Sequence, residues 1–572
     1  MTQDVVRQVG GRTWHVAGEW ADVLFPPGGD TPLAAMADGR DGRIVKHGQG
    51  RRIVRTELAG RGLFVKQYTG SRRWRRLPRK EWRVARWARR VGLPTVEPVA
   101  ACWQGGAFYI TAETPGARTL GDLLYKECFE PAADEPPYPG HRPPELVRLH
   151  RRRRAPGSDV PDARTLASLL ADLVATLHSL GLRHTDLHPN NLLVIRDGPA
   201  WRLDVLDLPA LEEMPGPGSL VEHLVQLNHF FEPLATRTER RRVLRLLERR
   251  GLTVDGGARR IEAATQRYRR RFYRRRDGRC LRQSKYFRAI RAGRFVGMAA
   301  ADWAPLLPDG EAAMARTLEI AQVAKQSRGG ESGFATVGGG RVFIKRDPQA
   351  GPRPSRGPWP RILEDWCRGT RAERAWRRGH ALLVRGVGTA RPLAWLDRRD
   401  GLRGRHGTIV TEALDGHRPL DRVLPELRGR DRAACIETVA REIRRLHDSG
   451  LSHRDLKAQN ILLRRDGVSW RAALVDMDGL SGPSRRVTEA RRTKDLMRLA
   501  FSWDWGYGAA DAVAGAGACD CLRLLKTYLG PAMRGAITVS CRHRGSTAPA
   551  AELRRWWHAV RLAMDRKAAR KR

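Results

Sequence analysis

The feature that most constrains this sequence is a short stretch that occurs twice. "GLSHRDLKAQNILL" spans residues 450–463, and the related "GLRHTDLHPNNLLV" spans residues 181–194, which is 269 residues earlier. Upstream of these, "KHGQGRRIVRTELAGRGLFVK" (46–66) and "KQSRGGESGFATVGGGRVFIK" (325–345) pair without a gap. Matches that keep their order over most of both halves indicate tandem copies of one domain. We therefore expect one domain at residues 1–278 and a second at residues 279–572.

Both halves show the same order of predicted secondary structure. Strand patterns rich in Gly and β-branched residues come first, and a helical segment follows, "RKEWRVARWARRVG" or "RAERAWRRGHALLVRG". A longer helix, "LASLLADLVATLHSLG" or "RAACIETVAREIRRLHDSG", ends at Gly just before each repeated stretch. This order predicts an α+β fold of two tandem bilobal units, each with a small β-rich N-lobe and a helical C-lobe.

The first half is longer than the second by about 30 residues, which fall around "EPAADEPPYPGHRPPELVRLHRRRRAPGSDV". Segments so rich in Pro and Arg are typical of surface loops. We expect an insertion near residues 130–162 that forms a loop and not a domain of its own.

An Asp, an Asn five residues later and a second Asp sixteen residues after the Asn recur in both halves. Phosphoryl transfer needs a carboxylate that orients the attacking hydroxyl and accepts its proton, and oxygen ligands that hold Mg²⁺ against the phosphates. The first Asp suits the first role, and the Asn with the second Asp suits the metal. These residues are Asp186, Asn191 and Asp207 in the first half, and Asp455, Asn460 and Asp476 in the second half.

A lysine ends a strand-like apolar triplet at the same place in both halves, Lys66 in "GLFVKQY" and Lys345 in "RVFIKRD". The ordinary interpretation of such a residue is a strand-edge lysine. The chain has only 12 Lys against 94 Arg, so a lysine at matched positions indicates a site that requires a compact point charge. We expect both lysines to bind the tail of a nucleotide.

With these residues in view, both halves resemble the protein-kinase-like fold, and more narrowly the bacterial lipopolysaccharide core kinases of the Kdo and heptose kinase group. The resemblance rests on "AERAWRRGHALLVRGVGTARPLAW" followed by "HRDLKAQNILL", and it covers roughly residues 40–230 and 320–500. "HTDLHPNNLLV" is similar to small-molecule kinases such as aminoglycoside and choline kinases. The resemblance implies ATP as donor, Mg²⁺ as metal and a sugar hydroxyl of the inner core as acceptor.

The resemblance also implies roles for further residues. These are Lys457 and His188 at the transferred phosphate or the acceptor, Gly48, Gly50, Gly329 and Gly330 at the nucleotide, and Glu81 and Glu373 as candidate ion-pair partners of the two lysines. Neither glycine turn is a full GxGxxG. Aligning Trp82 with Trp376 places Glu81 opposite Ala375, so at least one of the two glutamates is not the partner.

Four histidines near the repeated stretches have ordinary explanations. We expect His184 and His453 to pack the loop around the catalytic Asp without transferring protons. His178 and His447 are expected to be plain helix-end residues.

The net charge of +44 and runs such as "RYRRRFYRRR" (267–276) predict an anionic partner. A coding bias toward Arg is the alternative. For this chain we expect lipopolysaccharide or another anionic glycolipid, with peripheral contact to an anionic membrane. Helix-turn-helix, zinc and RNP signatures are missing from the sequence, so nucleic acid is not expected. A signal peptide and a membrane span are not predicted either, which favours a cytoplasmic protein at the inner face of the inner membrane.

Alternative functions are compatible with the same motifs. One is a protein kinase or small-molecule kinase of this fold, although neither half has an APE-like segment after its second Asp. Another is a membrane-associated pseudokinase scaffold, although each half keeps every phosphotransfer group. We expect the second half to be the more active, because it has Lys457 and keeps a Gly after its metal Asp in "DMDGL".

Overall fold

A computed structural model describes the chain except for residues 1–2, 28–30, 39–41, 49, 70–75, 132–148, 152–159, 233, 328–329, 348–366, 400–404, 468, 482–486, 504–517, 538–548 and 570–572. Its contacts divide the chain into two compact units. Unit 1 contains Met1–Pro131 and Leu149–Arg269, and unit 2 contains Arg270–Arg572. The division falls within helix α9 (Gly257–Asp277), so the predicted boundary after residue 278 stays a prediction.

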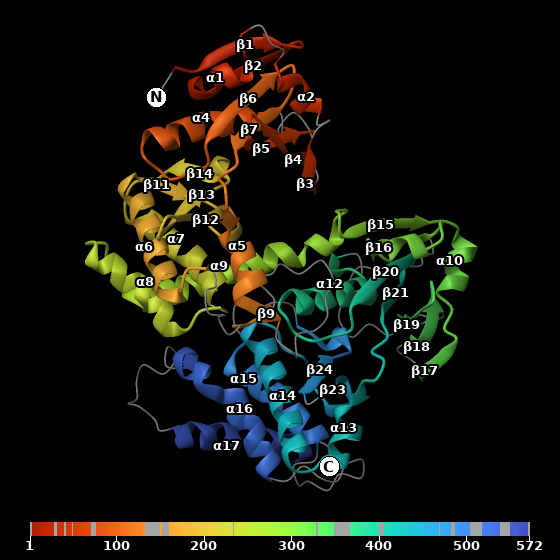
Figure 1. Ribbon diagram of the computed structural model, residues 1–572. Coiled ribbons are helices and arrows are strands. Elements are labelled where there is room, and N and C mark those ends of the chain that lie inside the picture. Colours follow the sequence, from red (N-terminus) through yellow and green to blue (C-terminus); the bar gives the residue numbers. More distant parts are fainter. Residues whose placement is uncertain are drawn as a thin grey trace. The chain divides into compact units, whose positions relative to one another are not determined.

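The first half of unit 1 is an antiparallel sheet whose described strands have the order β1-β2-β6-β7-β5-β4-β3 (Figure 1). Helix α4 (Leu77–Arg90) packs on it, because its apolar face Trp82, Ala85 and Ala88 is buried at a spacing of three residues. Leu63 and Val65 alternate with more exposed neighbours along β5 and enter the core, as the pleat of a strand requires. The strands are β1 (Val5–Val9), β2 (Arg12–Val16), β3 (Arg43–Gly48), β4 (Arg51–Leu58), β5 (Arg61–Tyr68), β6 (Pro98–Gln104) and β7 (Phe108–Ala112).

The second half of unit 1 is mainly helical. Helix α6 (Ala163–Ser179) begins where the side chain of Asp162 accepts a hydrogen bond from the backbone N–H of Thr165. A small described sheet, β13-β12-β8, follows the repeated stretch. The remaining elements are β8 (Arg118–Thr119), β11 (Leu182–His184), β12 (Leu192–Asp197), β13 (Ala200–Val205), β14 (Leu211–Glu213), α7 (Pro217–Phe231) and α8 (Arg237–Arg249).

Unit 2 has the corresponding order of elements. Its larger described sheet runs β15-β16-β20-β21-β19-β18-β17, and its smaller one runs β22-β23-β24. The strands are β15 (Phe287–Ala292), β16 (Phe295–Ala300), β17 (Gln322–Ser327), β18 (Gly330–Val337), β19 (Gly340–Arg346), β20 (Pro392–Arg399), β21 (Arg405–Glu412), β22 (Arg418–Pro419), β23 (Ile461–Asp466) and β24 (Ser469–Leu474). The longer helices are α12 (Arg371–Val384), α14 (Gly429–Asp448), α15 (Glu489–Ser502), α16 (Ala518–Ile537) and α17 (Pro549–Ala569).

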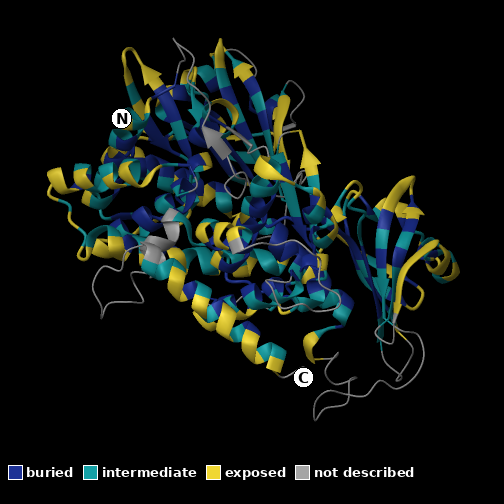
Figure 2. Ribbon diagram, turned by 90° about the horizontal axis from the view of Figure 1, so that it is seen from below, coloured by how far each residue is buried: buried dark blue, intermediate teal, exposed yellow. Residues whose placement is uncertain are grey.

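The helices predicted before each repeated stretch are confirmed as α4, α6, α12 and α14. Buried residues, dark blue in Figure 2, gather along the strands and the inner faces of the helices. Most of the predicted insertion near residues 130–162 lies outside the described residues. Close to it, β9 (Phe129–Pro131) and β10 (Leu149–Arg151) pair in antiparallel fashion. Among the helices that the structure describes, none has the length and apolarity needed to cross a bilayer.

Candidate active site

The repeated stretch forms the same loop in both units, held by a buried histidine. In unit 2, Nε2 of His453 lies 3.0 Å from the carbonyl oxygen of Val475, and the backbone N–H of Asp455 donates to its Nδ1 at 3.3 Å. His184 of unit 1 makes the corresponding contacts at the same two distances, 3.0 and 3.3 Å. Since Nδ1 accepts, Nε2 carries the proton, and burial lowers the pKa of both histidines. A neutral imidazole in this position orients the loop, as expected from the sequence.

The two predicted metal aspartates share a rare backbone conformation. Asp207 has φ 55° and ψ 51°, and Asp476 has φ 63° and ψ 62°. Among the described residues, only Ala59 joins them as a non-glycine at positive φ. Left-handed backbone of this kind costs on the order of 1–3 kcal/mol, and it persists where the surroundings hold it in place. Both units therefore present the second Asp of the motif in the same way, directly after a strand, β13 or β24.

In unit 2 the predicted phosphotransfer residues line one cavity of about 1270 Å³. Its walls come from the larger sheet, from α12, from the repeated loop and from the turn after β24. The predicted residues that line it are Gly330, Lys345, Asp455, Lys457, Asn460 and Asp476. Gly329 lies outside the described residues.

The orientation of Asn460 fits a metal ligand. Its amide group donates to the backbone oxygen of Asp455 at 2.8 Å and to the carboxylate of Asp455 at 3.2 Å. Both hydrogen bonds use the amide nitrogen, so the side-chain carbonyl oxygen is the atom that would ligate a metal. With the carboxylate of Asp476 it supplies two hard oxygen ligands, and Mg²⁺ typically takes one or two protein ligands and completes its shell with water and phosphate oxygens. Asn191 of unit 1 donates to the backbone oxygen of Asp186 in the same way, at 2.9 Å.

Lys345 is held by two carboxylates of the turn after β24. Its Nζ lies 2.8 Å from Oδ1 of Asp476 and 3.0 Å from Oδ2 of Asp478, and Arg371 contacts the same oxygen of Asp478 at 2.8 Å. Burial opposes the charge of the ammonium group, but the two acids outweigh it and raise the pKa of Lys345. Burial likewise opposes ionisation of Asp476, yet Lys345 lowers the pKa of this carboxyl. The pair is therefore ionised at neutral pH.

The two lysines differ in their partners. In unit 1, Lys66 lies 3.0 Å from a carboxylate oxygen of Glu81, which is only 2% exposed, and Tyr68 donates to the other oxygen. Lys345 of unit 2 contacts Asp476 and Asp478 in place of the predicted candidate Glu373. The alignment of the two buried tryptophans explains this, because it places an alanine where unit 1 has Glu81.

The residue two positions after the first Asp of the motif contacts that Asp in both units. Nζ of Lys457 lies 2.9 Å from Oδ2 of Asp455, and Nε2 of His188 lies 3.5 Å from Oδ2 of Asp186. Partial burial opposes ionisation of Asp455, but Lys457 and the Asn460 amide lower its pKa overall. Asp455 is therefore an anion at neutral pH and can accept a hydrogen bond from an incoming hydroxyl.

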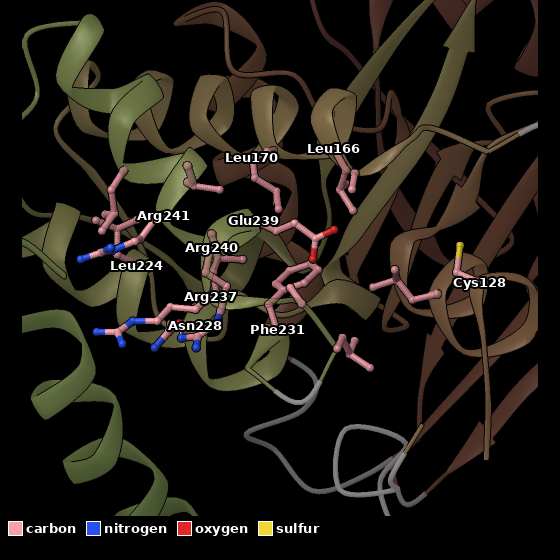
Figure 3. A pocket seen from close by; sticks show the side chains of 18 of the residues that line it. Cys128, Leu166, Leu170, Leu224, Asn228, Phe231, Arg237, Glu239, Arg240 and Arg241 are labelled. Carbon is pink, nitrogen blue, oxygen red and sulfur yellow. Dashed lines mark hydrogen bonds between the residues drawn. The ribbon is translucent and has the colours of Figure 1, made fainter. Parts of the chain in front are cut away.

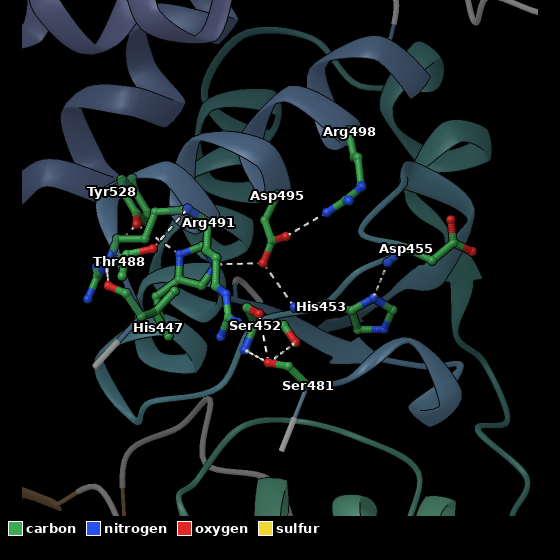
Figure 4. Close-up of polar contacts among 12 residues, drawn as sticks. His447, Ser452, His453, Asp455, Ser481, Thr488, Arg491, Asp495, Arg498 and Tyr528 are labelled. Atoms are coloured by element: carbon green, nitrogen blue, oxygen red, sulfur yellow. Dashed lines mark hydrogen bonds and ion pairs between the residues drawn. The ribbon is translucent and has the colours of Figure 1, made fainter. Parts of the chain in front are cut away.

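Sequence reasoning missed Asp495, which lies on the buried face of α15 (Figure 4). Its Oδ2 accepts from the backbone N–H of His453 at 2.9 Å and lies 3.1 Å from Nε2 of His447, while Oδ1 accepts from Arg498 at 2.9 Å. Tyr528 completes the chain of contacts, 2.8 Å from Nδ1 of His447. The expectation that His447 is an ordinary helix-end residue is therefore wrong, because it is 1% exposed and joins α14, α15 and α16. An acid among the apolar positions of a helix was the available signal.

Unit 1 supports its loop with neutral groups. Nε2 of His223, on α7, accepts a hydrogen bond from the backbone N–H of His184 at 2.9 Å. The side-chain oxygen of Gln226 accepts from the backbone N–H of Leu187, and its side-chain nitrogen donates to the backbone oxygen of His184. Burial lowers the pKa of His223 to about 3, so the ring is uncharged. The same backbone donor is thus bound by an anion in unit 2 and by an imidazole in unit 1.

The glycine turn of unit 1 lies between β3 and β4. Gly48 ends β3, and Gly50 has φ +82°, a conformation that favours glycine. A separate cavity of about 600 Å³ lies in the helical half of unit 1, where Leu166, Leu170 and Phe231 line it (Figure 3). The residues predicted for phosphotransfer do not line this second cavity.

Comparisons with known proteins agree with the site in unit 2. Residues 362–528 match the model of the Lipopolysaccharide kinase (Kdo/WaaP) family. The 3-deoxy-D-manno-octulosonic acid kinase of Stenotrophomonas maltophilia (strain R551-3) is 39% identical over 131 residues, which are 23% of this chain and 49% of that protein. The same-named kinase of Xylella fastidiosa (strain 9a5c) is 35% identical over 136 residues, 23% of this chain and 51% of that protein. The chain thus spans about half the length of these curated relatives.

Two further relatives have WaaP in their names. The lipopolysaccharide core heptose(I) kinase WaaP of Pseudomonas aeruginosa PAO1 is 26% identical over 211 residues, 31% of this chain and 69% of that protein. The solved structure described as WaaP in complex with acyl carrier protein aligns with a TM-score of 0.33 and 23% identity over 50% of this chain and 98% of that one. From the family match, the C-terminal part of the chain, within residues 362–528, carries a domain of the lipopolysaccharide kinase (Kdo/WaaP) family.

Proposed function

We propose that unit 2 transfers a phosphoryl group from ATP to a sugar hydroxyl of the lipopolysaccharide inner core, on Kdo or heptose. The observation that carries this proposal is the single cavity of about 1270 Å³ that Lys345, Asp455, Lys457, Asn460 and Asp476 line together. The same region matches a family of lipopolysaccharide kinases. The relatives' names differ in the sugar, so both sugars stay within the proposal.

Each side chain has a defined task in this reaction. The ionised carboxylate of Asp455 accepts a hydrogen bond from the acceptor hydroxyl and takes its proton as the oxygen attacks the γ-phosphorus. The bond from the γ-phosphorus to the bridging oxygen breaks, and ADP leaves. Lys457, 2.9 Å from that carboxylate, meets the negative charge that develops on the transferred group. Lys345 binds the phosphates of the nucleotide. Asn460 and Asp476 would hold Mg²⁺, which neutralises phosphate charge when it is bound.

We further propose that unit 1 is a kinase-like domain of the same bilobal design, so that the chain is a tandem pair with a boundary near residue 278. The matching strand order, the left-handed Asp207 and the Lys66–Glu81 ion pair support this. Asp186, Asn191 and Asp207 would then serve as Asp455, Asn460 and Asp476 do in unit 2.

The acceptor in this proposal is an anionic glycolipid, so the protein would work at an anionic membrane surface. Basic side chains of α8 and α9, including Arg237, Arg241 and Arg245, are exposed and suit such a surface. The positive charge of these side chains supports attraction to anionic lipid. We also propose a cytoplasmic location for the protein.

The proposal is tested by transfer of labelled phosphate from ATP to dephosphorylated core lipid by the full chain. Asp455→Asn should lower the rate at least a thousandfold while nucleotide plus Mg²⁺ still raises the melting temperature. In a chain that also carries Lys66→Met, which removes the nucleotide lysine proposed for unit 1, Asp476→Asn should lose both transfer and the Mg²⁺-dependent shift. Asp431→Asn, which removes an exposed carboxylate of α14 paired with Arg465, is the matched control and should keep wild-type activity.

Single and double variants separate the two units. If Asp186→Asn leaves transfer intact and Asp455→Asn abolishes it, unit 2 is the catalyst and unit 1 has another role. Full activity in the Asp186→Asn/Asp455→Asn double variant would refute a kinase function for either unit.

A further inference from the structure

The cavity of unit 2 continues beyond the catalytic loop to a group of three cations. Lys457 comes from the loop itself, Arg498 from α15 and Lys567 from α17, and all three line the cavity. Helix α17 begins at Pro549 and therefore lies outside the residues that match the family model. The nucleotide and metal residues described above do not explain Arg498 or Lys567.

Arg498 lies close to the catalytic loop, because one hydrogen bond ties its helix to the loop and another positions its side chain. The backbone N–H of Ala458, next to Lys457, donates to the hydroxyl of Ser502 at 2.9 Å, which ties the end of α15 to the loop. Arg498 lies one turn earlier on the same helix face and also lines the cavity. Its guanidinium group donates to Oδ1 of Asp495 at 2.9 Å (Figure 4), and the side chain remains 30% exposed.

Lys567 reaches the same wall from the last helix. Its Nζ lies 4.1 Å from the centre of the Phe501 ring, and Phe501 lines the cavity beside Ser502. Helix α17 is held there by Met564, which is 1% exposed and lies in the same apolar core as Leu496 and Leu499 of α15. Since residues three apart share a helix face, this packing directs Lys567 toward the rim of the cavity.

Five of the cations that line the cavity fall into two groups by the acids that they lie near. Lys345 and Arg371 contact the turn of Asp476 and Asp478, where the metal and the nucleotide phosphates are proposed to bind. Lys457 instead contacts Asp455, the residue that acts on the acceptor hydroxyl. Arg498 and Lys567 belong to this second side, because Ser502 joins their helix pair to the loop of Lys457.

We propose that Arg498 and Lys567 form a subsite for an anionic group of the acceptor, a carboxylate or a phosphate close to the hydroxyl that is phosphorylated. This inference rests on the proposed function of unit 2. The fork of Arg498 suits bidentate binding of either anion, and Lys567 adds a point charge. The subsite selects acidic sugars and aligns their hydroxyl with Asp455.

The test measures KM and kcat of the full chain for core lipid and for ATP separately. Lys567→Met and Arg498→Met should each raise the KM for the acceptor about tenfold, as expected when one charge-assisted contact is lost. The KM for ATP should change less than twofold. Lys567→Arg should restore most of the acceptor affinity. The matched controls Arg566→Met and Arg491→Met remove exposed cations of α17 and α15 and should behave as wild type.

Two modified acceptors identify the anion. The reference acceptor is core lipid that lacks only the phosphate at the accepting hydroxyl. The wild type should prefer it over the same lipid with its carboxyl groups reduced if a carboxylate is bound, or over the fully dephosphorylated lipid if a phosphate is bound. The Arg498→Met/Lys567→Met variant should show neither preference. An unchanged acceptor KM in Lys567→Met and in the double variant overturns the subsite. If the wild type itself transfers no phosphate to any core lipid, the proposed function fails instead.

Discussion

Replacing Asp495 by Ala should remove the hydrogen bonds that hold the catalytic loop of unit 2 in place, and so destabilise this unit. The carboxylate is 2% exposed and accepts from the backbone N–H of His453 and from Arg498, and it contacts Nε2 of His447. Two of these partners, His453 and His447, are buried. Each buried donor left without an acceptor costs about 1–3 kcal/mol, and breaking a buried charged network costs about 3–5 kcal/mol in total.

The expected loss of about 3–5 kcal/mol corresponds to a melting temperature lower by about 6–10 °C for a unit of this size. Calorimetry of the full chain measures this shift, and hydrogen exchange of peptides around residue 453 should show faster exchange of the loop amides. The rate of phosphate transfer should also fall, because the loop is less ordered. Glu489→Gln is the control on the same helix, since it removes an exposed carboxylate paired with Arg555 and should cost less than about 1 kcal/mol. A melting temperature and exchange pattern equal to wild type in Asp495→Ala would refute this account of the loop.

Three shorter predictions follow from other contacts. Burial raises the pKa of Asp397 to about 6, so the folded state binds a proton that the unfolded state releases, and this stability is present at low pH and lost as pH rises from about 4 to 6. Asp397→Asn should therefore stabilise the protein by about 2–3 kcal/mol at pH 8 and hardly at all at pH 4, measured as urea unfolding at both values. Lys66→Met should leave Glu81 buried at 2% exposure with only Tyr68 as partner, and it should lower the melting temperature of the chain more than Lys526→Met on α16. Binding to anionic vesicles should weaken steeply as salt rises from about 0.05 to 0.3 M, whereas equal binding to neutral vesicles would assign the net charge of +44 to coding bias.

The repeated loop could be predicted from sequence because its roles depend on local spacing. An Asp and an Asn five residues apart share one short turn, and this arrangement fixes the amide of Asn460 against Asp455 without help from distant residues. The succession of strands and helices along the chain followed from hydrophobic spacing and from the repeat, since one copy could be checked against the other. The order of the strands within each sheet was not predicted. Helices α4, α6, α12 and α14 could be predicted because their apolar residues recur at regular helical spacing.

The partners of these residues could not be predicted, because they lie far away in the sequence. Asp478 is 133 residues from Lys345, and Asp495 is 42 residues from His453. Once Ala375 stands where unit 1 has Glu81, nothing in α12 itself indicates which carboxylate replaces it. The role of α17 was missed for a similar reason, since Lys567 reaches the cavity only through packing on α15.

The two units use different carboxylates to hold the lysine of the site, and this difference can be tested by moving the carboxylate of unit 2 to the position that it has in unit 1. In unit 1 the lysine partner Glu81 comes from helix α4, whereas in unit 2 Asp478 comes from the same turn as Asp476, the proposed metal ligand. Metal binding should draw Asp476 away from Lys345, so Asp478 must keep the lysine in place for the phosphates. Asp478→Asn should therefore weaken Mg²⁺-nucleotide binding about tenfold, the loss expected for one charge-assisted contact.

Adding Ala375→Glu to that variant should recover much of the affinity, because Ala375 lines the same cavity on α12 and occupies the position of Glu81. Isothermal titration of the full chain that carries Lys66→Met isolates unit 2 for this measurement. Wild-type affinity in Asp478→Asn would show that Asp478 does not position Lys345. If binding stays weak after Ala375→Glu is added, the partner of Lys345 must come from the turn of Asp476 and Asp478. The two units would then position their lysines by different contacts.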